Sequence, residues 1–125
     1  MPWLKNSLQD LVSTGISPQR IVLGLPSFTR VWKQDQNGDI VQNPAYSYSY
    51  VETMLTKNHT KMEWNPELGE YYASYQSDSK NVQVWMANSK SLQTYIALGQ
   101  QYGVAGSAIW SLNMMDAEHW NETFQ

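Results

Sequence analysis

The chain has 125 residues, of which 42% are hydrophobic, 13% aromatic and only 15% charged. This length suits a single domain, and the composition excludes both a disordered tail and a charged coiled coil. A net charge of -3 excludes a global attraction to nucleic acid or anionic membrane. The absence of cysteine excludes disulfide bonds and thiol catalysis. No apolar run approaches the roughly 20 residues of a membrane span, and no signal-peptide pattern follows Met1.

Aromatic side chains are unusually numerous. Six tryptophans and eight tyrosines stand beside many asparagines and glutamines, whereas lysine and arginine together total eight. Flat amphipathic rings beside neutral amides suit a ligand with apolar ring faces and many hydroxyls, which describes a carbohydrate. The alternative interpretation is that most of these rings are core residues or half-buried sheet residues.

The first segment predicts one unit of a β/α repeat. Apolar residues at helical spacing predict a helix over Trp3–Thr14, and Gly15 follows where a left-handed terminal residue belongs. A continuous apolar run over Arg20–Leu25, closed by Pro26, is typical of a parallel strand buried on both faces.

The middle of the chain, from Lys33 to about Lys80, has a different character. Asn37-Gly38 is the favoured pair for a tight hairpin, followed by a short strand at Ile40-Val41. Helical spacing marks Tyr50–Lys57, and loose alternation of tyrosines marks a strand over Glu70–Tyr75. This stretch predicts a small antiparallel α+β insertion.

The β/α pattern then resumes toward the C-terminus. We expect a strand at Val82–Met86, a helix capped by Ser89 or Ser91 and ending before Gly103, and a second buried strand over Val104–Leu112. Asp116 can cap a last helix. Two buried parallel strands cannot cover themselves, so the chain is expected to be part of a larger β/α architecture.

Ligands in parallel β/α folds meet the C-terminal ends of the strands. Those ends are Pro26–Trp32 and Trp110–Asn113, and both combine aromatic and polar residues. Trp110 is a candidate stacking floor for a sugar ring, and Arg30 a candidate donor to ligand oxygens or to a carboxylate. The alternatives are a space-filling tryptophan at the rim and an arginine in a surface ion pair.

Other chemistries lack their motifs. His59 and His119 are far apart and have no H-x-x-x-H or cysteine partner, so no metal site is expected. No nucleophile elbow, Walker loop or dinucleotide fingerprint is present, and no cofactor is predicted. The two acidic clusters, Glu63 with Glu67 and Glu70, and Asp116 with Glu118, are expected to be a solvated face and a helix cap.

Two motifs resemble glycoside hydrolase family 18. Arg20–Trp32 reads RIVLGLPSFTRVW and is similar to the family's k-i-v-l-G-l-P-x-Y-G-R-x-W, and Gly103–Leu112 is similar to its lgGvaiWsl. The resemblance covers essentially the whole chain. It implies an α/β fold that is the C-terminal portion of a (β/α)8 TIM barrel, strands 7 and 8, with a small α+β insertion. The implied units are residues 1–32 and 81–125 as barrel segments and residues 33–80 as the insertion.

The resemblance also implies a chemistry. Family 18 enzymes hydrolyse β-1,4 bonds of N-acetylglucosamine-containing glycans of the chitin or peptidoglycan type by substrate-assisted retaining catalysis. Their catalytic acids belong to a D-x-x-D-x-D-x-E motif that this chain lacks, so no catalytic residue is assigned and the chain alone is predicted to be inactive. The implied substrate-binding residues are Trp110, Arg30, Phe28 and Trp32. Phe28 and Thr29 depart from the family's Tyr and Gly.

Three functional hypotheses remain open at this stage. The favoured one is a part of a longer family 18 glycosidase, extracellular or associated with the cell wall. The second is a non-catalytic carbohydrate-binding module, and the third is an assembly piece whose strand edges pair with another chain. The partner expected is an N-acetylglucosamine glycan, with no nucleic acid and no membrane, and the isolated chain is expected to self-associate or to be partly ordered.

Overall fold

A computed structural model describes residues 1–125 as a mixed α/β fold, which confirms the predicted class. Its α-helices are α1 (Pro2–Ser13), α2 (Tyr48–Lys57), α3 (Ser89–Gln101) and α4 (Ala117–Thr123), with short 3-10 turns η1 (Pro18–Arg20) and η2 (Leu112–Met114). Its strands are β1 (Val22–Pro26), β2 (Thr29–Gln34), β3 (Ile40–Gln42), β4 (Ala45–Tyr46), β5 (Glu63–Asn65), β6 (Glu70–Ser77), β7 (Lys80–Met86) and β8 (Gly106–Trp110).

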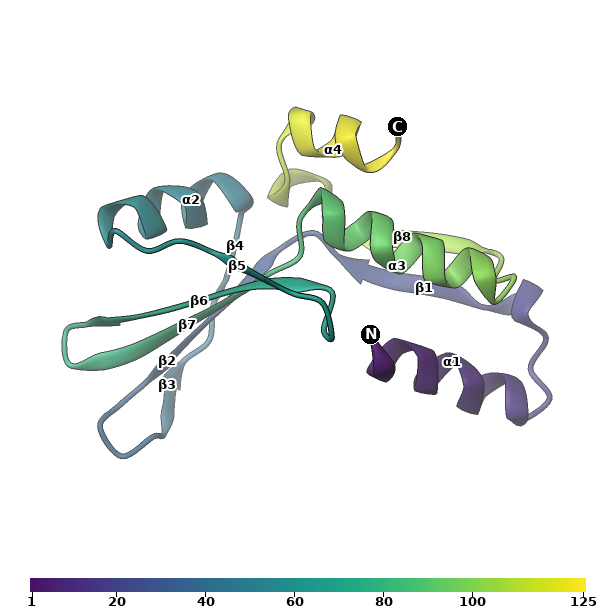
Figure 1. Cartoon of the computed structure of the whole chain (residues 1–125), viewed down its shortest axis with the longest axis horizontal. Helices are drawn as coiled ribbons and strands as arrows, with labels where there is room; N and C mark the ends of the chain where they lie inside the picture. The colour runs from purple at the N-terminus through teal and green to yellow at the C-terminus, as the bar shows by residue number, and fades with distance from the viewer.

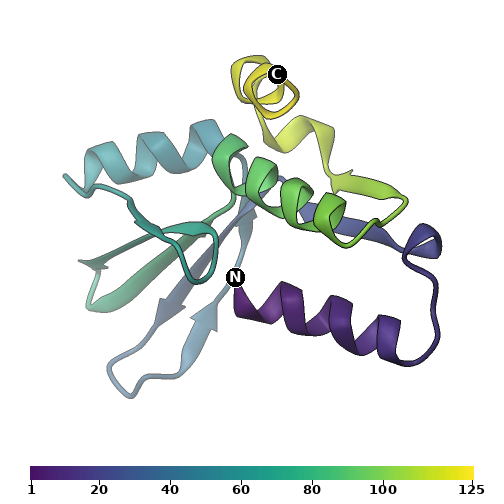
Figure 2. The same ribbon diagram turned by 45° about the vertical axis from the view of Figure 1, so that its right-hand side comes forward.

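The chain forms two halves that lie side by side (Figure 1). One half, called here the parallel half, consists of α1, β1, α3, β8 and α4, and its two strands pair in parallel. The other, called the antiparallel half, consists of α2 and the strands β2 to β7. Turning the molecule by 45° keeps the two halves apart (Figure 2). Each half has its own cluster of buried hydrophobic residues.

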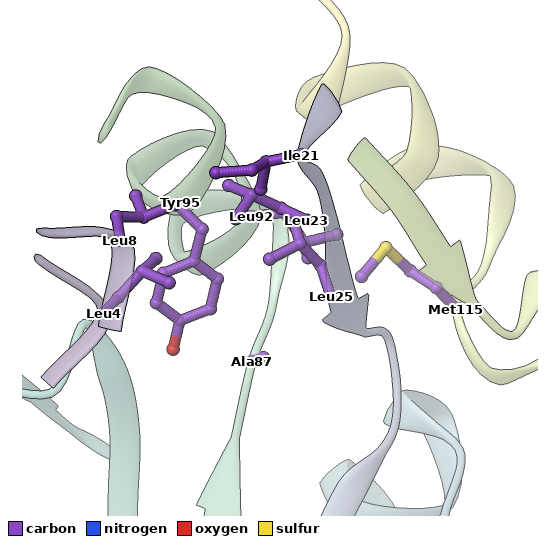
Figure 3. Close-up of a cluster of buried hydrophobic side chains, with 9 residues drawn as sticks. All are labelled: Leu4, Leu8, Ile21, Leu23, Leu25, Ala87, Leu92, Tyr95 and Met115. Atoms are coloured by element: carbon purple, nitrogen blue, oxygen red, sulfur yellow. The ribbon is translucent and has the colours of Figure 1, made fainter. Parts of the chain in front are cut away.

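The core of the parallel half lies on one face of β1. Figure 3 shows leucines of α1 together with Leu92 and Tyr95 of α3 gathered beside Leu23 and Leu25 of β1. The opposite face is uncovered, and Val22 is 58% exposed. Within this chain the two strands are buried on one face only, as expected of two parallel strands that cannot cover themselves. The helices of this chain cover only one face of the pair, and no residue of β8 is buried.

The helices of the parallel half begin and end close to the predicted residues. Gly15, at φ +88°, follows α1, and Gly103, at φ +69°, follows α3. Both glycines adopt the left-handed conformation that ends a helix at little cost. The N-cap of α3 is Asn88, whose Oδ1 accepts a hydrogen bond from the Ser91 N–H, so the predicted Ser89 or Ser91 cap is wrong by one or three residues.

The antiparallel half is a six-stranded sheet with the order β3-β2-β7-β6-β5, and β4 also pairs with β2. Alternate residues of the central strands, such as Val31 and Val84, point to one face and pack against Val51 and Leu55 of α2. Alternation of this kind lets an antiparallel sheet bury one face and leave the other to water. The predicted helix and the strands at Ile40-Val41 and Glu70–Tyr75 are confirmed.

The sheet extends beyond the predicted insertion of residues 33–80. Strand β2 begins at Thr29, and β7 runs to Met86 while pairing antiparallel with both β2 and β6. Val82–Met86 therefore belongs to this sheet and does not resume the β/α pattern as predicted. The physical reason is its alternation, because the side chains of Val82, Val84 and Met86 are buried while those between them are not.

Side-chain contacts also join the two halves, among them a hydrogen bond of 3.3 Å from Nε1 of Trp3 in α1 to the Leu68 carbonyl. The hydroxyl of Tyr95 in α3 donates a hydrogen bond of 3.0 Å to Oε1 of Glu70 in β6. The ring of Tyr48 at the start of α2 lies 3.8 Å, centroid to centroid, from the ring of His119 in α4. None of the four α-helices combines the length and the apolar character needed to span a membrane.

Candidate functional site

The C-terminal ends of the two parallel strands lie together. Strands β1 and β8 pair in register from Val22 opposite Gly106 to Pro26 opposite Trp110. Beyond the pairing, the Ser27 N–H donates to the Trp110 carbonyl at 2.8 Å, and the Ser27 hydroxyl donates to the Ser111 carbonyl at 2.7 Å. The Trp110–Ser111 peptide bond is cis. The two loops that sequence analysis singled out are thus tied to each other by a buried serine.

Trp110 presents its side chain to solvent at this junction. Its side chain is 75% exposed, among the most exposed of the large hydrophobic residues. It follows Gly106 and Ala108 at alternate positions of β8, so it extends from a face whose other residues are small. A broad ring on such a face is accessible to a ligand lying across the strand ends.

Arg30 stands at the start of β2 with an unneutralised charge. Its Nη1 donates to the Asn43 carbonyl at 2.9 Å, and its guanidinium lies 5.3 Å from the centre of the Phe28 ring. Arg30 forms no ion pair with any carboxylate of the chain. The alternative of a surface ion pair is therefore wrong, and the remaining guanidinium N–H groups are free to donate to a ligand.

The structure gathers three of the four predicted substrate-binding residues. Phe28 contacts Arg30, and Trp32 follows Arg30 on the same face of β2. Trp110 lies outside this group and is connected to it through Ser27, the neighbour of Phe28. The arrangement is a line of groups that begins at the strand ends and continues onto the antiparallel sheet.

A hollow of about 500 Å³ opens on the sheet beside Arg30. Its lining residues come from β2, β3, β6 and β7: Arg30, Trp32, Gln34, Ile40, Glu70, Gln83 and Trp85. The sequence predicted only Arg30 and Trp32 among these as ligand-binding residues, and the other five were missed. The alternation in β6 and β7 was the signal that could have separated the residues of this face from the buried ones, but it does not reveal which strands are neighbours.

Glu70 was predicted to lie on a solvated face, and this prediction is wrong. It is partly buried, and its Oε1 accepts the Tyr95 hydroxyl hydrogen bond. Burial raises the pKa of the Glu70 carboxyl, and the hydrogen bond from Tyr95 lowers it to a smaller extent. Glu70 is therefore a carboxyl group held at a defined place in the hollow by a tyrosine of the other half.

The second acidic cluster is a helix cap, as predicted. Asp116 Oδ1 accepts hydrogen bonds from the His119 N–H at 3.0 Å and the His119 ring Nδ1 at 2.7 Å. These bonds hold the pKa of Asp116 below its usual value. No group of three or more histidine, aspartate or glutamate side chains converges as metal ligands would.

Comparison with protein families gives a match over almost the whole chain. The family model described as glycosyl hydrolases family 18 matches residues 3–115. The chain belongs to this family. The resemblance drawn from the Arg20–Trp32 and Gly103–Leu112 motifs is thereby confirmed, and the family is one of hydrolases that act on glycosidic bonds.

Relatives within family 18 include chitobiases and glycosylases. A probable di-N-acetylchitobiase 2 of Dictyostelium discoideum is 30% identical over 138 residues, which cover 89% of this chain and 35% of that protein. A protein of Bacillus subtilis named uncharacterized glycosylase YvbX is 26% identical, over 94% of this chain and 33% of its own length. The chain therefore spans about a third of the length of these relatives.

Solved structures of family 18 share the fold. The C-terminal domain of a protein named a putative chitinase, from Desulfitobacterium hafniense, superposes with a TM-score of 0.82 at 20% identity, over 98% of this chain and 38% of that one. The spore cortex-lytic enzyme SleL of Bacillus megaterium gives 0.79 at 17% identity, over 98% and 29%. A Cycas revoluta chitinase in complex with allosamidin gives 0.68 at 22% identity, over 86% and 33%.

Proposed function

We propose that the chain is the C-terminal portion of a (β/α)8 barrel, with β1 and β8 as its strands 7 and 8. The support is the parallel register of β1 and β8, whose one face packs on α1 and α3 while the other exposes Val22 and Trp110. The antiparallel half is the insertion. Because its sheet runs from Thr29 to Met86, we place the barrel segments at residues 1–28 and 87–125.

The proposed activity is hydrolysis of β-1,4 bonds in N-acetylglucosamine-containing glycans by substrate-assisted retaining catalysis. In that mechanism a glutamic acid protonates the leaving oxygen and the substrate's own acetamido oxygen attacks the anomeric carbon. The glutamic acid would come from a strand outside this chain, which contains no D-x-x-D-x-D-x-E motif. This chain contributes the substrate-binding side of the cleft.

The observation that carries this assignment is the exposed ring of Trp110 at the joined ends of two parallel strands. An indole face there can stack on the apolar face of a sugar. Arg30, free of any ion pair, donates to ligand oxygens or to an active-site carboxylate. Phe28 supports the guanidinium from one side, and Trp32 continues the aromatic lining onto the sheet.

The first test is the coding sequence upstream of Met1. The proposal expects an open reading frame of roughly 200 further residues that carries D-x-x-D-x-D-x-E, the remainder of a barrel of typical size. An upstream region without that motif would contradict the proposed catalytic mechanism. It would favour the non-catalytic carbohydrate-binding module instead, for which the exposed Trp110 is equally suited.

The second test is enzymatic. The 125-residue chain alone should release no product from an N-acetylglucosamine oligomer, and the chain joined to its upstream segment should hydrolyse it. Trp110→Ala in the joined protein should lower kcat/KM by about tenfold or more, since a stacked ring is lost. Phe124→Ala, a change of an exposed ring directly after α4, is the matched control and should leave the rate unchanged. Hydrolysis by the chain alone would refute the assignment of the acid to another segment.

The cellular setting follows from the substrate. Chitin and peptidoglycan-type glycans lie outside the cytoplasmic membrane, and one structural relative is named a spore cortex-lytic enzyme. We therefore propose that the full-length protein acts outside the cell or at the cell wall.

A further inference from the structure

A further cavity lies in the antiparallel half, on the side of the sheet that faces α2. Its walls come from α2 and from the ends of β2, β6 and β7 near the turn that joins β6 to β7 (Figure 1). None of its lining residues belongs to the hollow beside Arg30. Its volume is about 210 Å³. Because a cavity of about 150 Å³ holds benzene, this one has room for a ring with a small substituent.

The sheet register brings two lysines into this cavity. Lys33 of β2 stands opposite Val82 of β7, and Lys80 precedes Val82 by two residues, so both lysines lie on the face that packs on α2. Residues in such a diagonal relation on neighbouring strands lie about 7–8 Å apart. Two ammonium groups on flexible stems can therefore reach one and the same ligand group.

The positive charge of the two lysines is not balanced within the cavity. Neither lysine forms an ion pair with a carboxylate of the chain, although both are partly buried. The cavity contains one carboxylate, that of Asp78 in the turn. With two lysines and one aspartate, the lining residues carry a net charge of +1. Because two neighbouring cations repel each other, an anion with a single charge would stabilise them.

The rest of the lining is aromatic and apolar. Tyr50 and Met54 stand one helical turn apart on α2, and Tyr75 of β6 stands opposite Val82. The Tyr50 ring is stacked on Tyr46, with centroids 4.4 Å apart and an interplanar angle of 26°, which restricts its movement. Burial, and to a smaller extent the neighbouring tyrosines, raise the pKa of Tyr75, so its hydroxyl stays protonated and can donate.

This combination of charge and apolar surface selects among anions. Inorganic phosphate would meet the lysines and leave Met54, Val82 and the tyrosine rings without a partner. A neutral ring would cover those surfaces and leave the lysines unbalanced. A carboxylate attached to an apolar body satisfies both parts of the lining, because a few charged donors in an otherwise apolar cavity orient such a ligand.

We propose that this cavity binds a small organic monocarboxylate. Its carboxylate lies between Lys33 and Lys80, and its apolar body packs on Met54, Val82 and the ring of Tyr75. The site is on the face of the sheet opposite Arg30, so it goes beyond the proposed function and does not depend on it.

The test is calorimetric titration of the 125-residue chain with benzoate and with benzyl alcohol, a neutral analogue of similar size. Benzoate should bind with a Kd in the millimolar range or tighter and should raise the melting temperature, and benzyl alcohol should bind at least about fivefold more weakly. Lys33→Gln and Lys80→Gln should each weaken benzoate binding by about fivefold or more. Lys57→Gln makes the same change of charge on α2 outside the cavity, and this matched control should bind as the unchanged chain does.

Two further variants separate the role of charge from folding. Lys80→Arg keeps the charge and should keep most of the affinity, and equal affinities of Lys80→Arg and Lys80→Gln would overturn the role of this cation. Asp78→Asn removes the one carboxylate of the cavity and should tighten benzoate binding by about twofold or more, an effect that a purely structural role would not produce. Weaker binding by Asp78→Asn, with an unchanged far-UV circular dichroism spectrum, would contradict the proposed balance of charges.

The remaining outcomes are decisive as well. Binding of inorganic phosphate as tight as that of benzoate would refute an organic ligand, because the apolar walls would then contribute nothing. An equal loss of affinity in Lys57→Gln and Lys80→Gln would reduce the effect to a general attraction of anions and would refute the site. No binding of benzoate at millimolar concentration would also refute it, whatever the hydrolysis assay of the joined protein shows.

Discussion

The two halves of the molecule bury their apolar side chains in different ways. In the antiparallel half, Val31, Val51 and Val84 are completely buried between the sheet and α2, and the other face of the sheet is left to polar and aromatic side chains. In the parallel half, Leu23 and Leu25 of β1 pack under α1 and α3, but β8 contributes no buried residue at all.

This difference follows from the kind of sheet. An antiparallel sheet is stable with one covered face, whereas parallel strands are normally covered on both. Val22, Trp110 and Leu112 are 58%, 75% and 77% exposed, and they mark the surface that the parallel half leaves open. The antiparallel half therefore buries its apolar face with its own residues. The parallel half leaves one face uncovered, and this face forms part of the proposed cleft.

The largest effects are expected from core truncations that test whether the halves unfold separately. Leu8→Ala in α1 and Leu55→Ala in α2 each remove a buried side chain and should lower the free energy of unfolding by about 2–5 kcal/mol. Hydrogen exchange should show that Leu55→Ala exposes mainly β6 and β7, whereas Leu8→Ala exposes mainly β1.

The matched control for these truncations is Val22→Ala. Val22 is exposed, so this change should alter the free energy of unfolding by no more than about 0.5 kcal/mol. If either core variant loses amide hydrogen-exchange protection equally in both halves, the chain unfolds as one cooperative unit. The two halves would then not differ in stability.

A smaller effect is expected where α3 approaches β1. A Cβ atom on Gly99 would lie 2.6 Å from Leu23 Cδ1 and 3.0 Å from Val104 Cγ2. Gly99→Ala should therefore cost about 1–3 kcal/mol by overpacking, despite the better helix propensity of alanine. Gly24→Ala is the control, because a Cβ there meets nothing within 4 Å. Thermal unfolding of both variants checks the expectation, and equal melting temperatures would contradict the tight contact.

Much of this architecture could be predicted from local patterns. Helical spacing and terminal glycines located α1 and α3 to within about two residues, and the rule that ligands meet strand ends pointed to Arg30 and Trp110. The rest depends on pairing. The alternation of Val82, Val84 and Met86 predicts a strand but not its neighbours, so β7 was assigned to the wrong half. The same limit hid Trp85, whose meeting with Arg30 exists only in the register of β2 and β7.

Loss of the α4 cap should have a moderate effect that depends on pH. Asp116→Ala removes the hydrogen bond from the His119 N–H and should destabilise the protein by about 1 kcal/mol near neutral pH. The pKa of Asp116 is depressed in the folded state, so its contribution is present above the unfolded pKa and is lost as pH falls through the folded pKa. The difference between the variant and the unchanged protein should therefore narrow in strong acid.

Denaturant unfolding at several pH values measures this difference, and Asp116→Asn is the control that keeps an oxygen acceptor without the charge. Because the His119 ring contacts Tyr48 of α2, the same series shows whether α4 couples the two halves. Coupling would appear as a loss of amide protection in α2 when Asp116 is replaced. Its absence would leave the halves connected through other contacts, among them the hydrogen bond between Tyr95 and Glu70.

The smallest effect is expected at that last connection. Burial raises the folded-state pKa of Glu70, so its stabilising contribution is complete below the unfolded pKa and is lost as pH rises through the folded pKa. Glu70→Gln keeps an oxygen for the Tyr95 hydroxyl and removes the charge. The variant should match the unchanged protein at about pH 4 and be slightly more stable, by roughly 0.5 kcal/mol or less, at about pH 7. Denaturant unfolding at the two pH values gives the comparison. A variant less stable at the higher pH would show that the Glu70 carboxylate is favoured by its surroundings, and that the two halves are held together there by a charge-assisted hydrogen bond.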